Sequence, residues 1–378
     1  MTRSTSVLLL SLLFACNTTE SPIDDETPEA GDSSALDCDR LEVLVDQACE
    51  SVEVSGVETR DFSFARAGWT LEGTLWYPQV SSPDYQPPGV VLVHGSGPNG
   101  RESLVPGSLG VTYAEPIPVL GGLAQALAER GFAVLSYDKR TCFVEARPEC
   151  PHSYTEYPGD LDAIRVDDFL EDARSAANAL AAEPDVADDI LIIGHSQGAS
   201  FVPILATEED VIHGGVMLAG AMLPIPESIE GQYDDFADWL EISDPGNPSI
   251  AELRMEADEA RAILDAIAAG TYPEPEYLGG SVEFWRSWMD IQAAFPAQLE
   301  ALEEPIAAYF GEFDFNIGPA HVEQLQSWIE AGLVDAELRT YPDLTHAFVY
   351  VTDEPPGHTS EFATEVVDDL VTWAVGRP

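Results

Sequence analysis

The sequence predicts an α/β fold in which a mostly parallel sheet is flanked by helices and carries an inserted helical cap. Three observations predict this fold. Short apolar runs alternate with helical patterns, a Gly-x-Ser-x-Gly motif stands between a strand and a helix, and the alternation stops over about residues 224–302. Alternating strands and helices favour a parallel sheet, because each helix carries the chain back across one face of it.

The elements follow one another from Glu58. An antiparallel strand pair is expected around Ala67-Gly68, where a turn separates two alternating patterns. Residues 89–94 form a continuous apolar run, which is typical of a strand buried on both faces. The same patterns predict helix 120–130, strand 132–137, helix 166–182, strand 189–194, strand 215–219, strand 305–310, helix 320–331, strand 337–341 and helix 360–375.

The stretch at about residues 224–302 is helix-prone, acidic and aromatic, and it precedes the strand at 305–310. We expect it to cap the edge at which the parallel strands end, because ligands bind at that edge in open α/β sheets. Packing of the cap onto the core is an equal alternative to a substrate role for its aromatic rings. The candidate substrate-binding residues are Tyr277, Phe284, Trp285 and Trp288.

The N-terminus predicts export. Arg3 precedes an apolar run at residues 7–15, which is typical of a signal peptide and too short to span a bilayer. The run ends in Leu13-Phe14-Ala15-Cys16, which resembles the lipobox of bacterial lipoproteins. We therefore expect a signal peptide over residues 1–16 and attachment to the membrane of the bacterial cell envelope through a lipid on Cys16. Plain secretion, with Cys16 removed or free, is the alternative.

Residues 17–37 are acidic and rich in Pro, Ser and Thr, which predicts a flexible tether. Residues 38–57 are expected as a lead-in to the main domain at 58–378. In an exported chain the four remaining cysteines indicate two disulfides. Proximity along the sequence favours one disulfide between the first two of these cysteines and one between the last two. Reduced, buried thiols are the alternative, and no ligand spacing predicts a metal site. The two favoured pairs are Cys38–Cys49 and Cys142–Cys150.

The chain is strongly acidic, with 68 Asp and Glu against 16 Lys and Arg and a formal net charge of −52. Lys139 is its only lysine. So few cations cannot neutralise phosphates, which makes anionic surfaces poor partners and predicts no nucleic-acid partner. The charge favours adaptation to a saline environment, and an ordinary acidic surface is the alternative.

The strongest chemical signal is Gly194-His195-Ser196-Gln197-Gly198, which follows an apolar strand and precedes a small-residue helix. A serine nucleophile in this motif stands on a sharp turn with strained dihedral angles, so glycines must flank it. The N-terminus of the following helix favours developing negative charge. We therefore predict Ser196 as the nucleophile, with a purely structural turn as the alternative.

His94-Gly95-Ser96-Gly97-Pro98 follows the first buried strand, and its glycines let the backbone pass close to a substrate. Acyl transfer needs two N–H donors for the oxyanion. We assign these donors to the backbone amides of Ser96 and Gln197. A tight turn without this role is the alternative.

An acid after a late strand and a histidine after that acid would complete a Ser–Asp–His order. Asp314 stands just past such a strand, and Glu312, which is nearer the strand end, is the rival carboxylate. His346 lies on a loop after the last strand. Beyond Asp314 the other histidines are His321, within a helix, and His358. We predict Asp314 as the acid and His346 as the base.

Five segments carry a family resemblance: His94-Gly95-Ser96-Gly97-Pro98-Asn99 with Arg101-Glu102, Tyr137-Asp138-Lys139-Arg140, Gly194-His195-Ser196-Gln197-Gly198, Phe284-Trp285-Arg286-Ser287-Trp288 and Gly311-Glu312-Phe313-Asp314. From about Phe62 to the C-terminus the chain resembles bacterial α/β-hydrolases related to dienelactone hydrolases and prolyl-oligopeptidase-type catalytic domains, most of all their small carboxylesterases. The resemblance implies the α/β-hydrolase fold, ester hydrolysis, a helical cap and no cofactor.

The sequence departs from these relatives at Thr141-Cys142-Phe143, where they usually have glycines. For the preceding Lys139 and Arg140 we expect structural ion pairs rather than a catalytic role. The expected substrate is a small-molecule carboxylic ester, cleaved through an acyl-enzyme. A peptidase or amidase of the same fold and a non-catalytic binding module are the alternatives.

The acidic composition predicts that thermal stability rises with salt. The screening length is about 30 Å at 0.01 M salt and about 3 Å at 1 M, so salt removes most repulsion between carboxylates. We expect the melting midpoint at neutral pH to increase between these NaCl concentrations, with KCl as a control for ion-specific effects. A flat or falling midpoint would contradict the saline-environment hypothesis.

Overall fold

The computed structural model describes residues 40–45, 48–108, 111–142, 163–352, 357–359 and 361–376. The expected signal peptide and tether, together with Cys16, Cys38 and Cys150, lie outside these residues. The described residues belong to one compact unit, Asp37–Pro378. Among them, no helix combines the length and the apolar character that crossing a bilayer requires.

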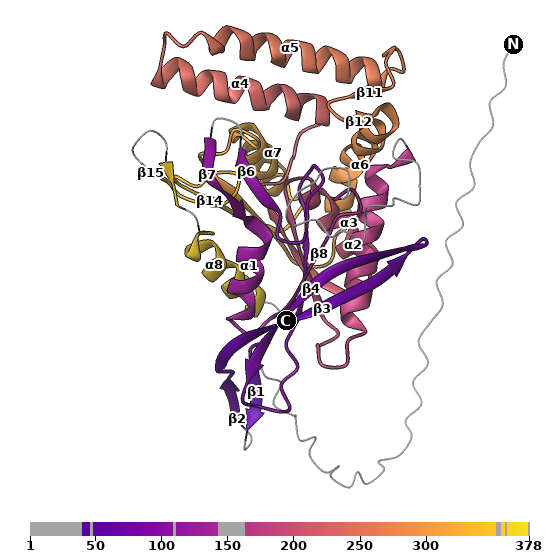
Figure 1. The fold of residues 1–378 in the computed structure, drawn as a ribbon, viewed down its shortest axis with the longest axis vertical. Coiled ribbons are helices and arrows are strands. Elements are labelled where there is room, and N and C mark those ends of the chain that lie inside the picture. The colour runs from indigo at the N-terminus through magenta and orange to yellow at the C-terminus, as the bar shows by residue number, and fades with distance from the viewer. Residues whose placement is uncertain are drawn as a thin grey trace, which may run out of the picture. The chain divides into compact units, whose positions relative to one another are not determined.

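An eight-stranded sheet forms the centre of this unit (Figure 1). Its strands are β3 (Val54–Arg66), β4 (Trp69–Val80), β5 (Gly89–Val93), β8 (Ala133–Tyr137), β9 (Ile190–His195), β10 (Ile212–Leu218), β13 (Ile306–Gly311) and β14 (Ala336–Tyr341). They lie in the order β14-β13-β10-β9-β5-β8-β4-β3, and the run from β14 to β8 is parallel. The predicted α/β architecture with a mostly parallel sheet is confirmed.

The antiparallel edge of the sheet is the strand pair expected around Ala67-Gly68. β3 pairs with β4 along nearly its whole length, and the connecting turn has φ 50° at Ala67 and φ 85° at Gly68. Positive φ at both residues gives a turn whose twist matches that of the strands it joins. β3 begins at Val54, before the expected start of the domain at Glu58.

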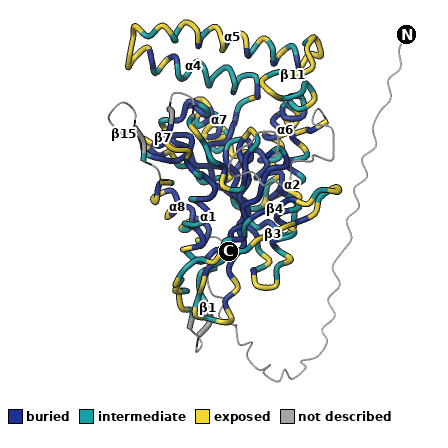
Figure 2. Tube along the Cα trace, in the orientation of Figure 1, coloured by how far each residue is buried: buried dark blue, intermediate teal, exposed yellow. Residues whose placement is uncertain are grey.

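Helices cover both faces of the sheet, as Figure 1 shows. They are α1 (Val119–Ala128), α2 (Val166–Ala181), α3 (Val202–Glu208), α6 (Val282–Ala301), α7 (Pro319–Glu330) and α8 (Thr364–Val375). α1 and α8 pack together on one face, and α2, α3 and α6 pack on the other. α7 joins the second group, because Trp328 contacts Phe295 of α6 with ring centroids 6.2 Å apart. With both faces covered, β5, β8, β9 and β13 are buried throughout (Figure 2).

The segment expected as a cap contains two different structures. α4 (Ile225–Ser243) and α5 (Ser249–Ala268) pack against each other around a small cluster of their own, formed by Ala237, Leu240 and Leu253. A short hairpin of β11 (Glu276–Tyr277) and β12 (Gly280–Ser281) follows. α6 contributes its buried side chains to the main core of the domain, and Ile225 of α4 and Leu264 and Ile267 of α5 join the same core. The α4–α5 pair therefore has a small cluster of its own and also packs onto the core.

Three further hairpins were not predicted. They are β1 (Glu42–Val45) with β2 (Ala48–Ser51), β6 (Leu104–Ser108) with β7 (Val111–Pro118), and β15 (Val351–Thr352) with β16 (Gly357–His358). Pro106 and Pro116 fall inside β6 and β7, and proline within a run argues against a strand because it cannot donate to the ladder. The β6–β7 register is irregular between Val105 and Gly107, next to Pro106.

Candidate active site

Ser196 stands where β9 passes into the short helix η3 (Ser196–Phe201), which continues into α3. Its backbone has φ 53°, in the left-handed region that residues other than glycine rarely adopt. The strained turn expected for the Gly-x-Ser-x-Gly motif is therefore present. The side chain is half-buried, so Oγ stands at a surface that a substrate can reach.

The two motif glycines make this turn possible. A Cβ on Gly194 would lie 2.2 Å from the carbonyl oxygen of Gly198, and one on Gly198 would lie 2.6 Å from the carbonyl oxygens of Val93 and His94. Backbone atoms cannot move aside as a flexible side chain can, so both positions require glycine. The same close contact brings the turn against the end of β5.

A buried acid–histidine pair lies after the neighbouring strands β13 and β14. The Nδ1–H of His346 donates to Oδ2 of Asp314 at 2.7 Å, and the two residues are 8% and 3% exposed. Oδ1 of Asp314 accepts from the backbone amides of Asn316 and Ile317 at 2.8 and 3.0 Å. Both carboxylate oxygens are thus held, and the histidine bond fixes the tautomer that leaves Nε2 free to accept a proton.

The His346 loop is tied to the serine turn. His195, the residue before Ser196, donates from Nε2 to the carbonyl oxygen of His346 at 2.8 Å, and the two imidazole rings lie 4.7 Å apart. Burial lowers the pKa of His195 to about 3, so it remains neutral. Thr345 exchanges a hydrogen bond of 2.9 Å with Tyr113 of β7. These contacts bring Ser196 and His346 into one site, although the described His346 ring bonds to Asp314 and not to Ser196 Oγ. Such nucleophile–base bonds often form only in the substrate complex.

Glu312, the rival carboxylate, faces elsewhere. It is exposed, and its Oε1 accepts from the hydroxyl of Thr340 at 3.0 Å. His321 is buried within α7, where its Nδ1 accepts from the Met222 amide at 2.8 Å and burial lowers its pKa to about 4. The structure therefore brings together Asp314 and His346 and leaves Glu312 outside this group.

The loop after β5 lies directly against Ser196. An ideal Cβ on Gly95 would be 3.1 Å from the Ser196 Cβ. Asn99 Nδ2 donates to the carbonyl oxygens of Gly95 and Ser96 at 3.1 and 2.8 Å, so both carbonyls point toward the Asn99 side chain. The Ser96 amide and the Gln197 amide, in the first turn of η3, are the two predicted oxyanion donors, and amides in a first turn have no partner within their own helix.

Comparison with known proteins settles the family. Residues 90–360 match the Alpha/beta hydrolase family. The chain belongs to this family. The esterase EstD of Thermotoga maritima is 27% identical over 316 residues, which cover 81% of this chain and 65% of that protein, slightly less than two thirds of its length.

Solved structures agree on the fold of this chain. Est1E from Butyrivibrio proteoclasticus matches with a TM-score of 0.50 and 15% identity, over 84% of this chain and 99% of that one. A puromycin-hydrolyzing peptidase of Mycobacterium tuberculosis matches with a TM-score of 0.51 and 16% identity, over 85% of this chain and 40% of that one. At these identities the likeness concerns the fold alone.

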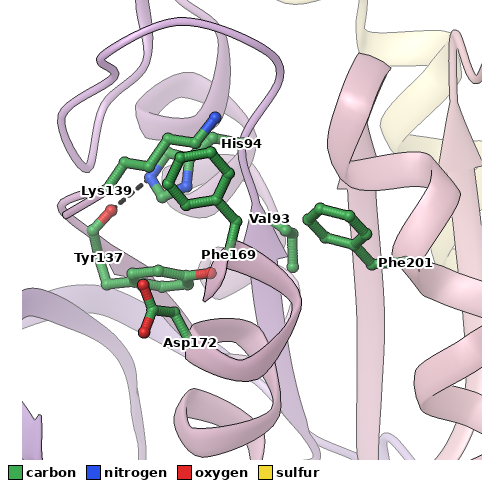
Figure 3. A pocket seen from close by; sticks show the side chains of 7 residues that line it. All are labelled: Val93, His94, Tyr137, Lys139, Phe169, Asp172 and Phe201. Carbon is green, nitrogen blue, oxygen red and sulfur yellow. Dashed lines mark hydrogen bonds between the residues drawn. The ribbon is translucent and has the colours of Figure 1, made fainter. Parts of the chain in front are cut away.

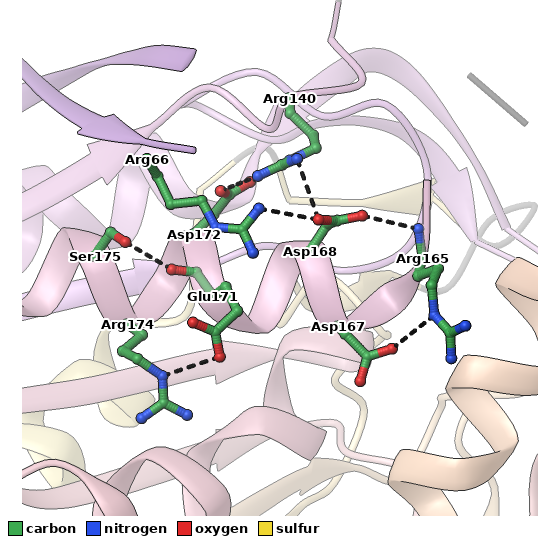
Figure 4. Close-up of polar contacts among 9 residues, drawn as sticks. All are labelled: Arg66, Arg140, Arg165, Asp167, Asp168, Glu171, Asp172, Arg174 and Ser175. Carbon is green, nitrogen blue, oxygen red and sulfur yellow. Dashed lines mark hydrogen bonds and ion pairs between the residues drawn. The ribbon is translucent and has the colours of Figure 1, made fainter. Parts of the chain in front are cut away.

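The two basic residues after β8 behave differently from each other. Arg140 forms the expected ion pair, since its Nε donates to Asp172 at 2.7 Å and its Nη1 lies 3.4 Å from Asp168 (Figure 4). Lys139 has no carboxylate partner among the described residues. Its Nζ donates to two uncharged acceptors, the Gly95 carbonyl oxygen at 2.7 Å and Gln197 Oε1 at 2.9 Å. The two side chains differ because they point to different places. The Lys139 amine lies against the serine turn, whereas the Arg140 guanidinium faces the carboxylates of α2.

The four aromatic candidates for substrate binding make packing contacts in the structure. Trp285 and Trp288 are 5% and 8% exposed and stack with ring centroids 5.6 Å apart. Trp285 also donates to the Tyr277 carbonyl oxygen at 2.7 Å, and Phe284 meets Phe169 of α2 edge-on at 6.3 Å. Packing accounts for these contacts, and a substrate role for the rings stays a prediction.

Cys49 and Cys142 are both disulfide-bonded. Their predicted partners, Cys38 and Cys150, lie outside the described residues, so the pairing itself stays a prediction. The described side chains contain no group of three or more His, Cys, Asp or Glu residues that could hold a metal ion.

Sequence reasoning missed three residues that support the site: Asn99, Tyr113 and Lys139. Asn99 and Lys139 stood within motifs that it had singled out, but the side-chain partners of Lys139 lie 44 and 58 residues away. Those of Asn99 lie only three and four residues before it, within the same loop. Tyr113 lies in a hairpin that was not predicted. The one available signal was that Lys139 is the only lysine in an acidic chain.

We predict that Gly198→Ala destabilises the protein, because the new Cβ would meet two backbone carbonyl oxygens. The expected loss in free energy of unfolding is about 1–3 kcal/mol, as for overpacked sites, measured by chemical denaturation. Gly231→Ala is the matched control: a Cβ there meets nothing within 4 Å, and Gly231 lies inside α4, so alanine should be neutral or stabilising. Equal stabilities for the two variants would refute the contact argument.

Proposed function

We propose that this hydrolase cleaves carboxylic esters by acyl transfer, with Ser196 as nucleophile, His346 as base and Asp314 as the residue that orients the base. One observation carries the proposal: the strained Ser196, between two obligatory glycines, lies on the turn that is hydrogen-bonded to the loop of the buried Asp314–His346 pair. A structural turn alone would not require a strained serine beside a held imidazole.

In the proposed reaction His346 takes the proton of Ser196 as Oγ attacks the ester carbonyl. The amides of Ser96 and Gln197 stabilise the oxyanion, and His346 then protonates the leaving alcohol. Water activated by His346 releases the acid and frees Ser196. Asp314 keeps Nδ1–H of His346 in place and stabilises the imidazolium without being protonated itself.

Distant similarity to the esterase EstD supports ester over amide substrates. The same triad chemistry also cleaves amides on related folds, so a peptidase activity is the competing function. Labelling with a fluorophosphonate probe separates an enzyme from a binding module. Parallel assays of nitrophenyl esters and the matching nitroanilides, at low and high salt, separate an esterase from an amidase.

We predict that Ser196→Ala abolishes ester hydrolysis and probe labelling while the fold is kept. Loss of the nucleophile should lower kcat by several orders of magnitude, because the oxyanion donors and binding contacts recover only part of the rate. Circular dichroism and thermal melting check the fold. A well-folded variant with wild-type turnover would overturn the assignment of the nucleophile.

We predict that Asp314→Asn is strongly impaired and that Glu312→Gln is close to wild type. Asparagine at position 314 would favour the wrong imidazole tautomer, whereas Glu312 bonds only to Thr340 among its described side-chain partners. The two substitutions are matched, since each replaces a carboxylate by its amide. The measurement is kcat/KM on one nitrophenyl ester, and the opposite ranking would assign the acid to Glu312.

A further inference from the structure

Lys139 lies buried directly behind the serine turn. The side chain is 3% exposed, and its Nζ lies over the ring of Phe169, 4.2 Å from the centroid (Figure 3). Two hydrogen bonds hold it, to the Gly95 carbonyl oxygen at 2.7 Å and to Gln197 Oε1 at 2.9 Å. Gly95 belongs to the loop after β5 and Gln197 to the turn after β9, so one amine bridges both segments that carry the proposed oxyanion donors.

The Gly95 carbonyl oxygen accepts from Lys139 Nζ at 2.7 Å and from Asn99 Nδ2 at 3.1 Å, and the shorter of these hydrogen bonds helps to set the direction of the Ser96 amide. In a trans peptide the C=O and the N–H point to opposite sides, and the described chain contains no cis peptide bond. Because the Gly95 carbonyl points to Lys139, the Ser96 N–H points away from it. None of the hydrogen bonds among the described residues uses this N–H as a donor. A donor on the carbonyl also strengthens the N–H of the same peptide, since linked hydrogen bonds polarise one another.

The second hydrogen bond fixes Gln197. Its side chain is 2% exposed, and its Nε2 is buried without a hydrogen-bond partner among the described residues. Lys139 is therefore the partner that holds this side chain through Oε1. The Gln197 backbone amide, which follows Ser196 directly, is the second proposed oxyanion donor. A buried amide N–H group without an acceptor lowers the stability of the fold. Glutamine at position 197 therefore fits a role in the candidate active site better than a role in stabilising the core.

The pairing of cations elsewhere makes Lys139 an exception. Every described arginine lies in an ion pair with a carboxylate, as Arg101 does with Asp138 and Arg140 with Asp172. Lys139 forms no ion pair with any of the described residues, and Asp172, the carboxylate that acts on it electrostatically, is hydrogen-bonded to Arg140. Burying an amine without a counter-ion lowers the stability of the fold, and an apolar residue at this position would be more favourable.

We propose that Lys139 is a positioning residue that sets both halves of the oxyanion hole, acting through the Gly95–Ser96 peptide and the Gln197 side chain. The inference rests on the proposed function and assigns a role to a residue outside the triad. Burial lowers the pKa of Lys139 to about 7, with Asp172 acting in the opposite direction. An ammonium has three N–H donors and a neutral amine two, so both hydrogen bonds persist in either protonation state.

The test is Lys139→Met, which keeps an unbranched side chain one atom shorter than that of lysine and removes both hydrogen bonds. Oxyanion contacts act in the transition state, so kcat on a nitrophenyl ester should fall about tenfold to a hundredfold with little change in KM. The rate of fluorophosphonate labelling should fall in parallel, because the phosphoryl oxygen occupies the same hole. Tyr85→Phe is the control, since it removes a buried hydrogen bond to the Gly131 carbonyl oxygen at the opposite edge of the sheet.

A folded Lys139→Met variant with kcat and labelling within twofold of wild type would overturn the inference. Wild-type labelling that is absent or independent of Ser196 would instead overturn the proposed function, so the two failures are distinguishable. A fall in kcat equal to that of Tyr85→Phe would mean that Lys139 serves the core alone.

The wild-type enzyme offers a second measurement that does not depend on the variant folding. Because Lys139 is the only lysine, isotopic labelling of lysine marks this one residue. We expect its side-chain NMR signal to shift when a fluorophosphonate traps Ser196, and to stay unchanged when the probe is added to Ser196→Ala. An unchanged signal in the trapped wild-type enzyme would overturn the proposed link between Lys139 and the oxyanion hole.

Discussion

The close approach of two backbone segments at Gly198 is the constraint on which the rest of the site depends. The carbonyl oxygens at the end of β5 lie where a Cβ of residue 198 would stand. This contact presses the serine turn against the loop that begins at His94 and leaves Ser196 with φ 53°. Strain of this kind persists only where the surroundings impose it, and here the parallel pairing of β5 with β9 does so.

The parallel sheet gathers the remaining groups around that contact. β5, β8, β9, β13 and β14 all run in one direction, so the residues that follow them meet at one edge. Asp138 after β8 accepts from the Arg101 amide at 2.8 Å and so holds the loop after β5. Side-chain bonds between these loops, rather than the strands themselves, then set the positions of individual donors and acceptors.

The helical pair α4–α5 is coupled to this edge through the loop of the acid. Trp239 of α4 meets Phe313, the residue before Asp314, with ring centroids 5.7 Å apart. Asp235 of α4 approaches Gly318 so closely that a Cβ there would lie 1.8 Å from its Oδ2. Burial, together with nearby carboxylates that include Asp314, raises the pKa of Asp235 to about 6. A movement of the α4–α5 pair would therefore shift the loop that carries Asp314.

The sequence by itself determined the alternation of strands and helices, because this depends on local periodicity. It also determined the strained serine turn, whose geometry requires the two flanking glycines, and the order of Ser196, Asp314 and His346 along the chain. Only the tertiary structure showed that Asp314 and not Glu312 bonds to the imidazole of His346, since that contact depends on how β13 pairs with β14. It also decided that Lys139 bridges two loops through uncharged acceptors, because these partners lie 44 and 58 residues away along the chain. Contacts at such separations leave no periodic trace in a single sequence.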